Sequence, residues 1–124
     1  LEAFQQGKPQ SLCKTVAELP SLSAKTVAEA AEKGDELAKE IYTISGTQLG
    51  KGLSILIDIL NPGMVVLGSV FQRSGHLLWP AAQKVLLSES LAAARGVCKV
   101  VPAKLGDSIG DYAAISIAVY HFGR

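Results

Sequence analysis

The residues of this chain that could do chemistry together lie in one short turn. Met64–Leu67 is apolar at every position, and Gly68, Ser69 and Val70 follow it directly. Proteins of the α/β class bind nucleotides where a buried strand ends in a turn of small residues, because the backbone can approach the ligand closely there. The same pattern occurs at ordinary strand-to-helix turns. The segment is therefore a candidate nucleotide site that needs support from the rest of the chain.

The other polar residues form no complete active site. His76 and His121 each lack a carboxylate or cysteine at metal-ligand spacing, which favours surface or structural roles. Asp107 precedes the last predicted helix and is interpreted as its N-cap. Glu2 is a carboxylate near the first residue and is either a solvated charge or part of a site. No Ser/His/Asp set, phosphate-loop sequence or metal motif can be assembled from the sequence.

Composition favours a single domain in the cytoplasm. The chain has 124 residues, 48% of them hydrophobic, which suits one compact core. A net charge of +1 without a basic stripe lacks the electrostatic footprint of a nucleic-acid binder.

No apolar run approaches the roughly 20 residues that span a bilayer. Cys13 and Cys98 lie far apart and are expected to be free thiols in a reducing compartment. Because Met64 is the only methionine, Leu1 is interpreted as a cut end.

The N-terminal part begins with weak helical signals. A helical pattern over Ser11–Glu18 ends at Pro20, and a clearer helix is predicted over Ala24–Lys33. Ser23 or Thr26 is expected to cap the start of the second helix.

A long helix is predicted next, from an N-cap at Asp35 to Leu60. Its middle carries Gly46, Gly50 and Gly52, and each glycine costs a helix about 1 kcal/mol relative to alanine. The glycines therefore indicate close approach of another backbone, which could be a packed helix, a sheet or a ligand.

The C-terminal half is predicted to alternate between strands and helices. The expected elements are a strand at Met64–Leu67, a helix from about Ser74 to Ser88 that starts or kinks near Pro80, an extension over Leu91–Arg95, a strand at Val97–Val101 and a helix at Ile109–Phe122. The first strand is expected to be covered on both faces. The last helix is expected to turn Ala113, Ala114, Ile117 and Ala118 inward. Because two strands do not make a stable sheet, another chain, another copy or missing sequence must complete it.

Several segments together resemble one known family. They are Leu1-Glu2-Ala3-Phe4, Thr26–Asp35, Leu49–Leu53, Ile59–Pro62, Val65–Gly68 and Leu105-Gly106-Asp107 through Ala114. Their order and spacing are similar to the ROK family (repressors, open reading frames and sugar kinases), in the part that follows its zinc-binding cysteine motif. The resemblance covers residues 1–124 as a single C-terminal fragment. It implies an α/β fold, the C-terminal part of an actin-like, ribonuclease-H-like ATPase domain, with an incomplete sheet and packed helices.

The resemblance also implies site residues and cofactors. Family kinases transfer the γ-phosphate of ATP, with Mg²⁺, to a hexose or an amino sugar. Glu2 matches a glutamate that binds sugar hydroxyls, and Gly68, Ser69 and Val70 match the turn beside the adenosine. Gly50 matches a position where the long helix packs by the nucleotide cleft. The phosphate loop, the catalytic aspartate and the ligands of a structural zinc would precede Leu1, so the fragment alone is expected to be inactive.

Two readings of function follow from the resemblance. The first is the C-terminal portion of a cytoplasmic ATP-dependent sugar kinase, and the alternative is the sugar-sensing and dimerisation part of a ROK transcriptional repressor. Nucleic acid is a partner only in the second. The other expected partners are the protein's own N-terminal portion and a second copy in a homodimer, with no membrane. The family's usual Gly-Gly after the strand reads Gly68-Ser69 here, and a usual glycine of the last helix reads Ala113.

Overall fold

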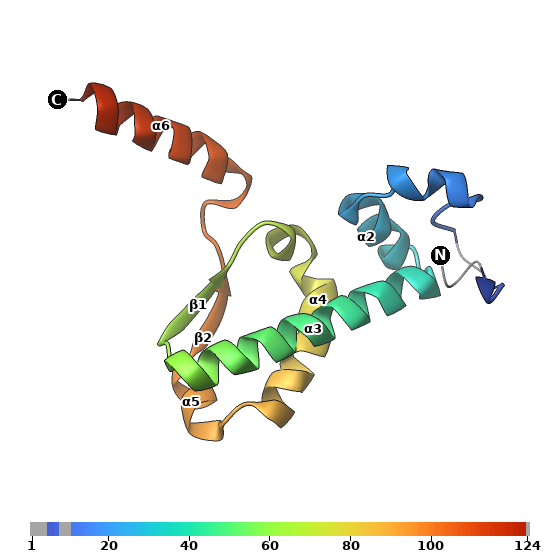
Figure 1. Ribbon diagram of the computed structural model, residues 1–124, viewed down its shortest axis with the longest axis horizontal. Helices are drawn as coiled ribbons and strands as arrows, with labels where there is room; N and C mark the ends of the chain where they lie inside the picture. The colour runs from blue at the N-terminus through green and yellow to red at the C-terminus, as the bar shows by residue number, and fades with distance from the viewer. Residues whose placement is uncertain (1–4, 8–10, 124) are drawn as a thin grey trace.

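The computed structural model describes residues 5–7 and 11–123, with the backbone alone of Asp107 (Figure 1). The elements in chain order are η1 (Val16–Ser21), α2 (Ala24–Glu32), α3 (Glu36–Leu60), β1 (Met64–Leu67), α4 (Val70–Glu89), α5 (Ala92–Val97), β2 (Lys99–Pro102), η2 (Gly106–Ser108) and α6 (Ile109–Phe122). Helices dominate, and the only sheet in the described part has two strands. The predicted order of helix, strand, helix, strand and helix is confirmed from α3 onward.

Local side-chain chemistry explains where α2 and α3 begin. Ser23 and Thr26 form a reciprocal capping box at the start of α2, which confirms the expected cap. Asp35 Oδ1 accepts the Ala38 N–H at 2.9 Å and caps α3 as predicted. Its other oxygen, Oδ2, accepts both the backbone N–H and the hydroxyl of Ser11, each at 2.6 Å. Asp35 therefore fixes the start of α3 and ties the N-terminal segment to it.

The first helical prediction is wrong in detail. A 3₁₀ helix covers Val16–Ser21 and contains Pro20, where the pattern indicated a helix over Ser11–Glu18 that Pro20 ends. Glu18 accounts for part of the difference, because its carboxylate accepts the Lys14 N–H at 2.7 Å and holds the preceding residues in a turn.

Two glycines let α3 pack directly against the backbone of α4. A Cβ at Gly46 would lie 2.3 Å from the Leu78 carbonyl oxygen, and one at Gly50 would lie 2.6 Å from the Ala82 carbonyl oxygen. Helix packing is therefore the reason for both glycines, one of the alternatives that the sequence left open. A Cβ at Gly52 would meet nothing within 4 Å.

The core lies where α3 meets its neighbours. One cluster joins α2, α3 and α4 and contains the buried residues Ala28, Ala31, Ala38, Tyr42 and Leu78. The other joins α3, α4 and α5 below the sheet and contains Leu53, Ile57, Leu86 and Ala94.

The two strands are parallel, and α4 and α5 form the crossover between them. The register pairs Met64 with Lys99 and Leu67 with Pro102. Helix α4 begins at Val70, four residues before the predicted start, and its non-helical backbone is at Ser74 rather than at Pro80. Helix α5 is separate from α4 and is not an extension of it.

One face of the sheet is covered, and the other is open. Val65, Leu67 and Val100 pack on the second core cluster. Met64 and Val66 remain 54% and 57% exposed, so the prediction of a strand covered on both faces is wrong within the described residues. An apolar strand predicts burial, but nothing in its sequence indicates which part of a protein supplies the cover.

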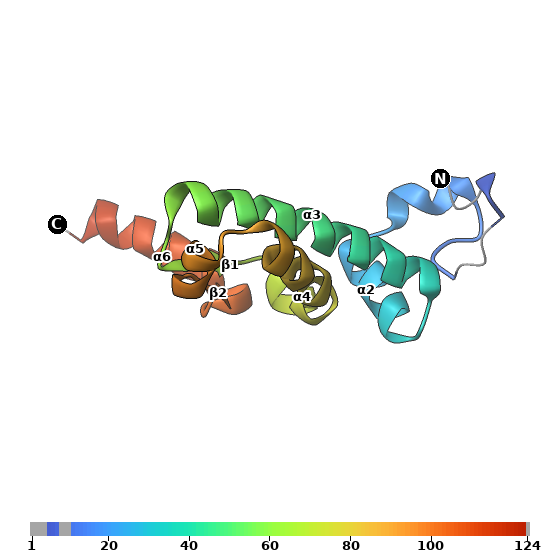
Figure 2. The ribbon, with the colours of Figure 1, turned by 90° about the horizontal axis from the view of Figure 1, so that it is seen from below.

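Helix α6 extends away from the body of the molecule (Figures 1 and 2). None of its described residues is buried, so the predicted inward face of Ala113, Ala114, Ile117 and Ala118 is wrong. Exposed apolar side chains lie on different sides of the helix, as Ile115, Ile117 and Tyr120 show, and such a helix has no single face that its sequence could mark as inner.

Candidate functional site

The predicted turn lies at the carboxyl ends of both strands. The Leu67 carbonyl accepts the Ala103 N–H at 2.8 Å, which holds the end of β1 beside the end of β2. The amide of Gln72 donates to the Ala103 carbonyl and ties the first turn of α4 to the same point. In parallel sheets this edge is where ligands bind, because the strand ends and helix N-termini meet there.

Ser69 adopts a backbone conformation that favours glycine. Its φ is 54° and its ψ is −124°, and its side chain makes no capping hydrogen bond to α4. The helix starts through two backbone bonds: Phe71 N–H donates to the Gly68 carbonyl and Gln72 N–H donates to the Ser69 carbonyl, at 3.2 and 3.1 Å. A non-glycine residue held in such a conformation stores roughly 1–3 kcal/mol of strain. The sharp turn is thus kept although its second residue is serine.

A hollow opens beside this turn, between the first turns of α4 and one side of α2. It has a volume of about 240 Å³ and is lined by Val70, Arg73 and Ser74 of α4 and by Lys25 and Glu29 among the residues of α2. Binding pockets for small molecules usually measure about 300–1,000 Å³. The hollow is therefore large enough for part of a ligand, such as a base or a ribose.

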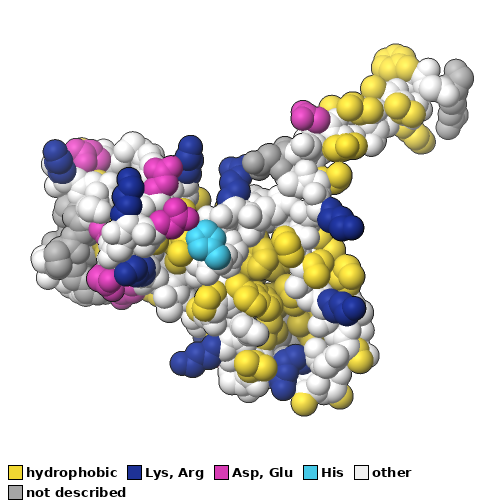
Figure 3. Space-filling model, turned by 180° about the vertical axis from the view of Figure 1, so that it is seen from behind, with side chains coloured by type: hydrophobic (Ala, Val, Ile, Leu, Met, Phe, Trp, Pro, Cys, Tyr) yellow, Lys and Arg dark blue, Asp and Glu magenta, His cyan; other side chains and the backbone are white. Residues whose placement is uncertain are grey.

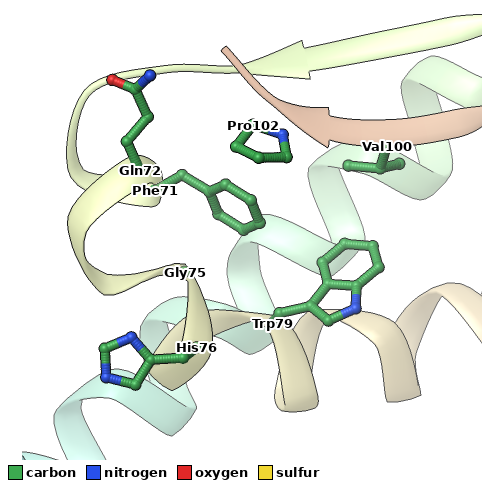
Figure 4. Close-up of a pocket in the computed structure, with 7 residues that line it drawn as sticks. All are labelled: Phe71, Gln72, Gly75, His76, Trp79, Val100 and Pro102. Atoms are coloured by element: carbon green, nitrogen blue, oxygen red, sulfur yellow. The ribbon is translucent and has the colours of Figure 1, made fainter. Parts of the chain in front are cut away.

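A second hollow lies on the β2 side of α4 and has a volume of about 430 Å³ (Figure 4). Phe71 and Trp79 meet edge to face in it, with ring centroids 6.1 Å apart. Val100 and Pro102 of β2 form the opposite side. Viewed from behind, hydrophobic side chains gather over this part of the molecule, with lysines and arginines around them (Figure 3). Its lining is mainly apolar, so it offers few groups for orienting a polar substrate.

His76 lines the second hollow, and its contact Glu32 lines the first. The Nε2 of His76 lies 3.1 Å from Glu32 Oε1, so the side chain links α4 to α2 across 44 residues of sequence. The His76 side chain is 58% exposed and contacts Glu32, which agrees with the predicted surface or structural role. His121 contacts Tyr120 edge to face, with ring centroids 5.5 Å apart. Among the described residues no group of three His, Cys, Asp or Glu side chains could hold a metal ion.

The predicted site residues are only partly brought together. Gly68, Ser69 and Val70 form the turn, and Val70 lines the adjacent hollow. Gly50 packs on Ala82, twelve residues along α4 from Val70, which corresponds to about 18 Å of helix. Its nucleotide role stays a prediction.

Two other predicted residues are not among those that line the hollows in the described structure. Glu2 lies outside the described residues. Asp107 belongs to η2, and Ser108 stands at the N-cap position of α6, so the prediction of Asp107 as the N-cap is wrong.

The sequence did not indicate some of the residues that line the hollows. Arg73 and Trp79 belong to no motif, and the α2 residues of the first hollow are distant in sequence from its α4 residues. The single tryptophan of the chain was the one available signal.

Comparison with known proteins decides the family. The model of the ROK family matches residues 2–120. This chain belongs to the ROK family. The DNA-binding transcriptional dual regulator NagC of Escherichia coli (strain K12) is 32% identical over 103 residues, which are 82% of this chain and 25% of that protein. The DNA-binding transcriptional repressor Mlc of the same strain is 30% identical over 93 residues, 75% of this chain and 23% of Mlc.

Two solved structures have the same arrangement. A ROK family transcriptional regulator, a homologue of E. coli Mlc, superposes with a TM-score of 0.69 at 27% identity, over 82% of this chain and 24% of that chain. A candidate sugar kinase from Cytophaga hutchinsonii superposes with a TM-score of 0.75 over 94% of this chain and 38% of that chain. Its 22% identity shows the fold alone.

The chain spans about a quarter of the curated relatives it matches. In the part that the structure describes, no helix is long and apolar enough to cross a membrane.

Proposed function

We propose that this chain is the C-terminal part of the sugar-binding domain of a ROK transcriptional regulator. The observation that carries the proposal is its 30–32% identity with two DNA-binding regulators over three quarters or more of its length. A further relative, 32% identical over 103 residues, is an N-acetylglucosamine repressor of Escherichia coli O6:H1, which makes an amino sugar the first effector to test. In this reading the protein senses a sugar and changes its affinity for DNA, and it does not phosphorylate the sugar.

The conformation of Ser69 also supports the regulator. A nucleotide at a strand-to-helix turn needs the backbone within reach of its phosphates or ribose. The Cβ and hydroxyl of Ser69 occupy space that glycine would leave open, at a residue whose φ of 54° favours glycine. The turn keeps its shape, and its surface is less open to a close ligand.

An ATP-dependent sugar kinase is the second candidate, because a ligand-sized hollow opens beside the same turn. The 240 Å³ space next to Val70 fits a base or ribose, and Arg73 provides a positive side chain on its rim. When bound, ATP with Mg²⁺ would supply the transferable phosphoryl group. In this candidate function the turn and the hollow beside Val70 would hold the adenosine end of the nucleotide. A sugar-binding role for Glu2 belongs to either candidate.

Sugar-dependent DNA binding tests the regulator. The intact protein that carries this chain is titrated against the DNA upstream of its own gene, by fluorescence anisotropy, with N-acetylglucosamine, its 6-phosphate or glucose. We expect at least one amino sugar to change the apparent DNA affinity by about 5–150-fold, the usual range of allosteric coupling. DNA affinity that is absent, or the same with every sugar, would overturn the proposal.

A further inference from the structure

The hollow on the β2 side of α4 continues into a smaller one. The 430 Å³ hollow shares Trp79 and Val100 with a neighbouring hollow of about 160 Å³, which continues along α4 to Leu87 and reaches Arg95 of α5. We refer to the two hollows together as the α4–β2 groove. From Gly75 to Leu87 the groove follows twelve residues of α4, which correspond to about 18 Å of helix.

The floor of the α4–β2 groove is apolar and aromatic. Phe71, Trp79 and Val100 are half-buried in it, and Leu87 is 60% exposed at one end. Among the described residues no Asp or Glu lines either hollow. Large apolar side chains, with tryptophan among them, are typical of the centres of protein interfaces. The groove therefore suits the apolar side chains of a protein partner better than it suits a polar small molecule.

The part of the chain that forms the groove is basic. Between residues 70 and 104 there are five Lys or Arg residues and one acidic residue, Glu89, whereas residues 1–60 carry six Lys and eight Asp or Glu. In Figure 3 Lys and Arg side chains lie around the hydrophobic patch over this part of the molecule. The groove is therefore set in a positive part of the surface.

Two of these cations lie at the groove itself. Arg95 lines its α5 end, and the guanidinium donates to the carbonyls of Leu86 and Ser90, which holds the charge in place. The exposed Lys84 lies on α4 about one turn before Leu87. Opposite charges across an interface favour the matching partner and disfavour others. A partner with carboxylates beside its apolar side chains is therefore complementary to the groove.

The sequence of β2 favours an open groove at this margin of the sheet. The N–H groups of Lys99 and Ala103 donate towards β1 at 3.0 and 2.8 Å, so the backbone groups of the alternate residues Val100 and Pro102 point away from β1. Proline has no N–H group and is typical of edge strands. A further strand beside β2 would lack a hydrogen bond at Pro102. A strand that completes the sheet is therefore expected beside β1, on the side away from the groove.

We propose that the α4–β2 groove binds an acidic amphipathic segment of another protein. The apolar side chains of that segment enter beside Trp79 and Leu87, and its carboxylates meet Lys84 and Arg95. A helix of about twelve residues matches the length of the groove, and amphipathic helices bind apolar grooves in this way. The apolar floor disfavours nucleic acid, because phosphates are bound mainly by cations. The inference does not depend on whether the protein is a regulator or a kinase.

Peptide selection on the intact protein tests the groove. A phage library of random twelve-residue peptides is depleted on the Leu87→Asp variant and then selected on the native protein. Because Leu87 is exposed, the substitution changes the surface of the groove and leaves the core intact. We expect the enriched peptides to combine a net negative charge with large apolar residues. Enriched peptides without a negative charge overturn the proposal, and so does a lack of enrichment, which is the result if another part of the protein covers the groove.

Fluorescence anisotropy with the most enriched peptide tests the basic rim. Lys84→Glu should weaken the peptide's dissociation constant by about fivefold at low salt, and by less at high salt because exposed charges are screened. Lys51→Glu is the matched control, because Lys51 is exposed on α3 and lines neither hollow. Equal affinity of the native protein and Lys84→Glu, or an equal loss in Lys51→Glu, contradicts the proposal. A random-sequence DNA duplex that displaces the peptide would assign the groove to nucleic acid and also overturn it.

Discussion

Gly50 and Gly52 of α3 are two positions in one helix where the same substitution should have opposite effects. An alanine Cβ at position 50 would lie 2.6 Å from the Ala82 carbonyl oxygen and 2.8 Å from the Val85 Cβ. The oxygen belongs to backbone, so α3 and α4 would have to separate. Overpacking of this kind costs roughly 1–3 kcal/mol, and the upper end applies here. Alanine returns about 1 kcal/mol through helix propensity, which leaves a net loss of about 2 kcal/mol.

Gly52→Ala is the control, and it should change the free energy of unfolding in the opposite direction. A Cβ at Gly52 meets nothing within 4 Å, so Gly52→Ala should gain about 1 kcal/mol from helix propensity alone. The two variants should therefore differ by about 3 kcal/mol in the free energy of unfolding. For a chain of this size that corresponds to a difference of roughly 10 °C in Tm.

Thermal and urea unfolding, followed by circular dichroism at equal protein concentration, measure both variants. Equal stability of Gly50→Ala and the native protein would refute the close contact between α3 and α4. A larger loss in Gly52→Ala than in Gly50→Ala would refute the assignment of the two faces of the helix.

Three further substitutions test the turn and the helix ends. Ser69→Gly should stabilise the protein by about 1 kcal/mol in urea unfolding, because it relieves the strain of a φ of 54°; a loss of stability would contradict that conformation. Asp35→Ala should cost about 1–2 kcal/mol at pH 7, since Asp35 caps α3 and binds Ser11. The hydrogen bond from the Ser11 side chain, helped by backbone donors, lowers the Asp35 pKa below 3.8, so this stability is present above pH 3.8 and is lost as the pH falls through the lowered value. A difference between native and variant that persists at the lowest pH would contradict the carboxylate's role. Arg95→Ala should cost about 1–2 kcal/mol, because its guanidinium donates to three carbonyls near the end of α4, and unchanged hydrogen exchange at that end would count against it.

Elements that are set by adjacent residues could be predicted from the sequence. Ser23 and Asp35 cap their helices as expected, and Asn61 ends α3 in a left-handed conformation just before Pro62. Strand β1 has the predicted bounds, because its fully apolar run is flanked directly by Gly63 and Gly68. These features depend on chemistry within a few residues.

Features that depend on distant contacts could not be predicted. Helix α4 begins four residues before its predicted start, and its first turn is tied through Gln72 to Ala103, the residue after β2, a contact across 31 residues. The sequence of α6 does not indicate which of its sides is the inner one, because none of its described residues is buried.

The candidate site also has one part that the sequence could predict and one part that it could not. The turn at Gly68–Val70 is visible as a pattern, whereas its hollow requires α2 and α4 to meet, and the link between His76 and Glu32 spans 44 residues. Of the three glycines in α3, the sequence could indicate close packing but could not indicate which ones face α4.

Phosphoryl transfer by the intact protein is the most direct test of the regulator assignment. The measurement is ADP formation from Mg-ATP in a coupled assay, with N-acetylglucosamine, N-acetylmannosamine, glucose or fructose as acceptor, for the native protein and for Ser69→Gly. We predict no sugar-dependent ADP formation in the native protein with any of the four. Sugar-dependent turnover at about 1 s⁻¹ or faster, within the usual range of enzymes, would contradict the regulator assignment and establish the kinase.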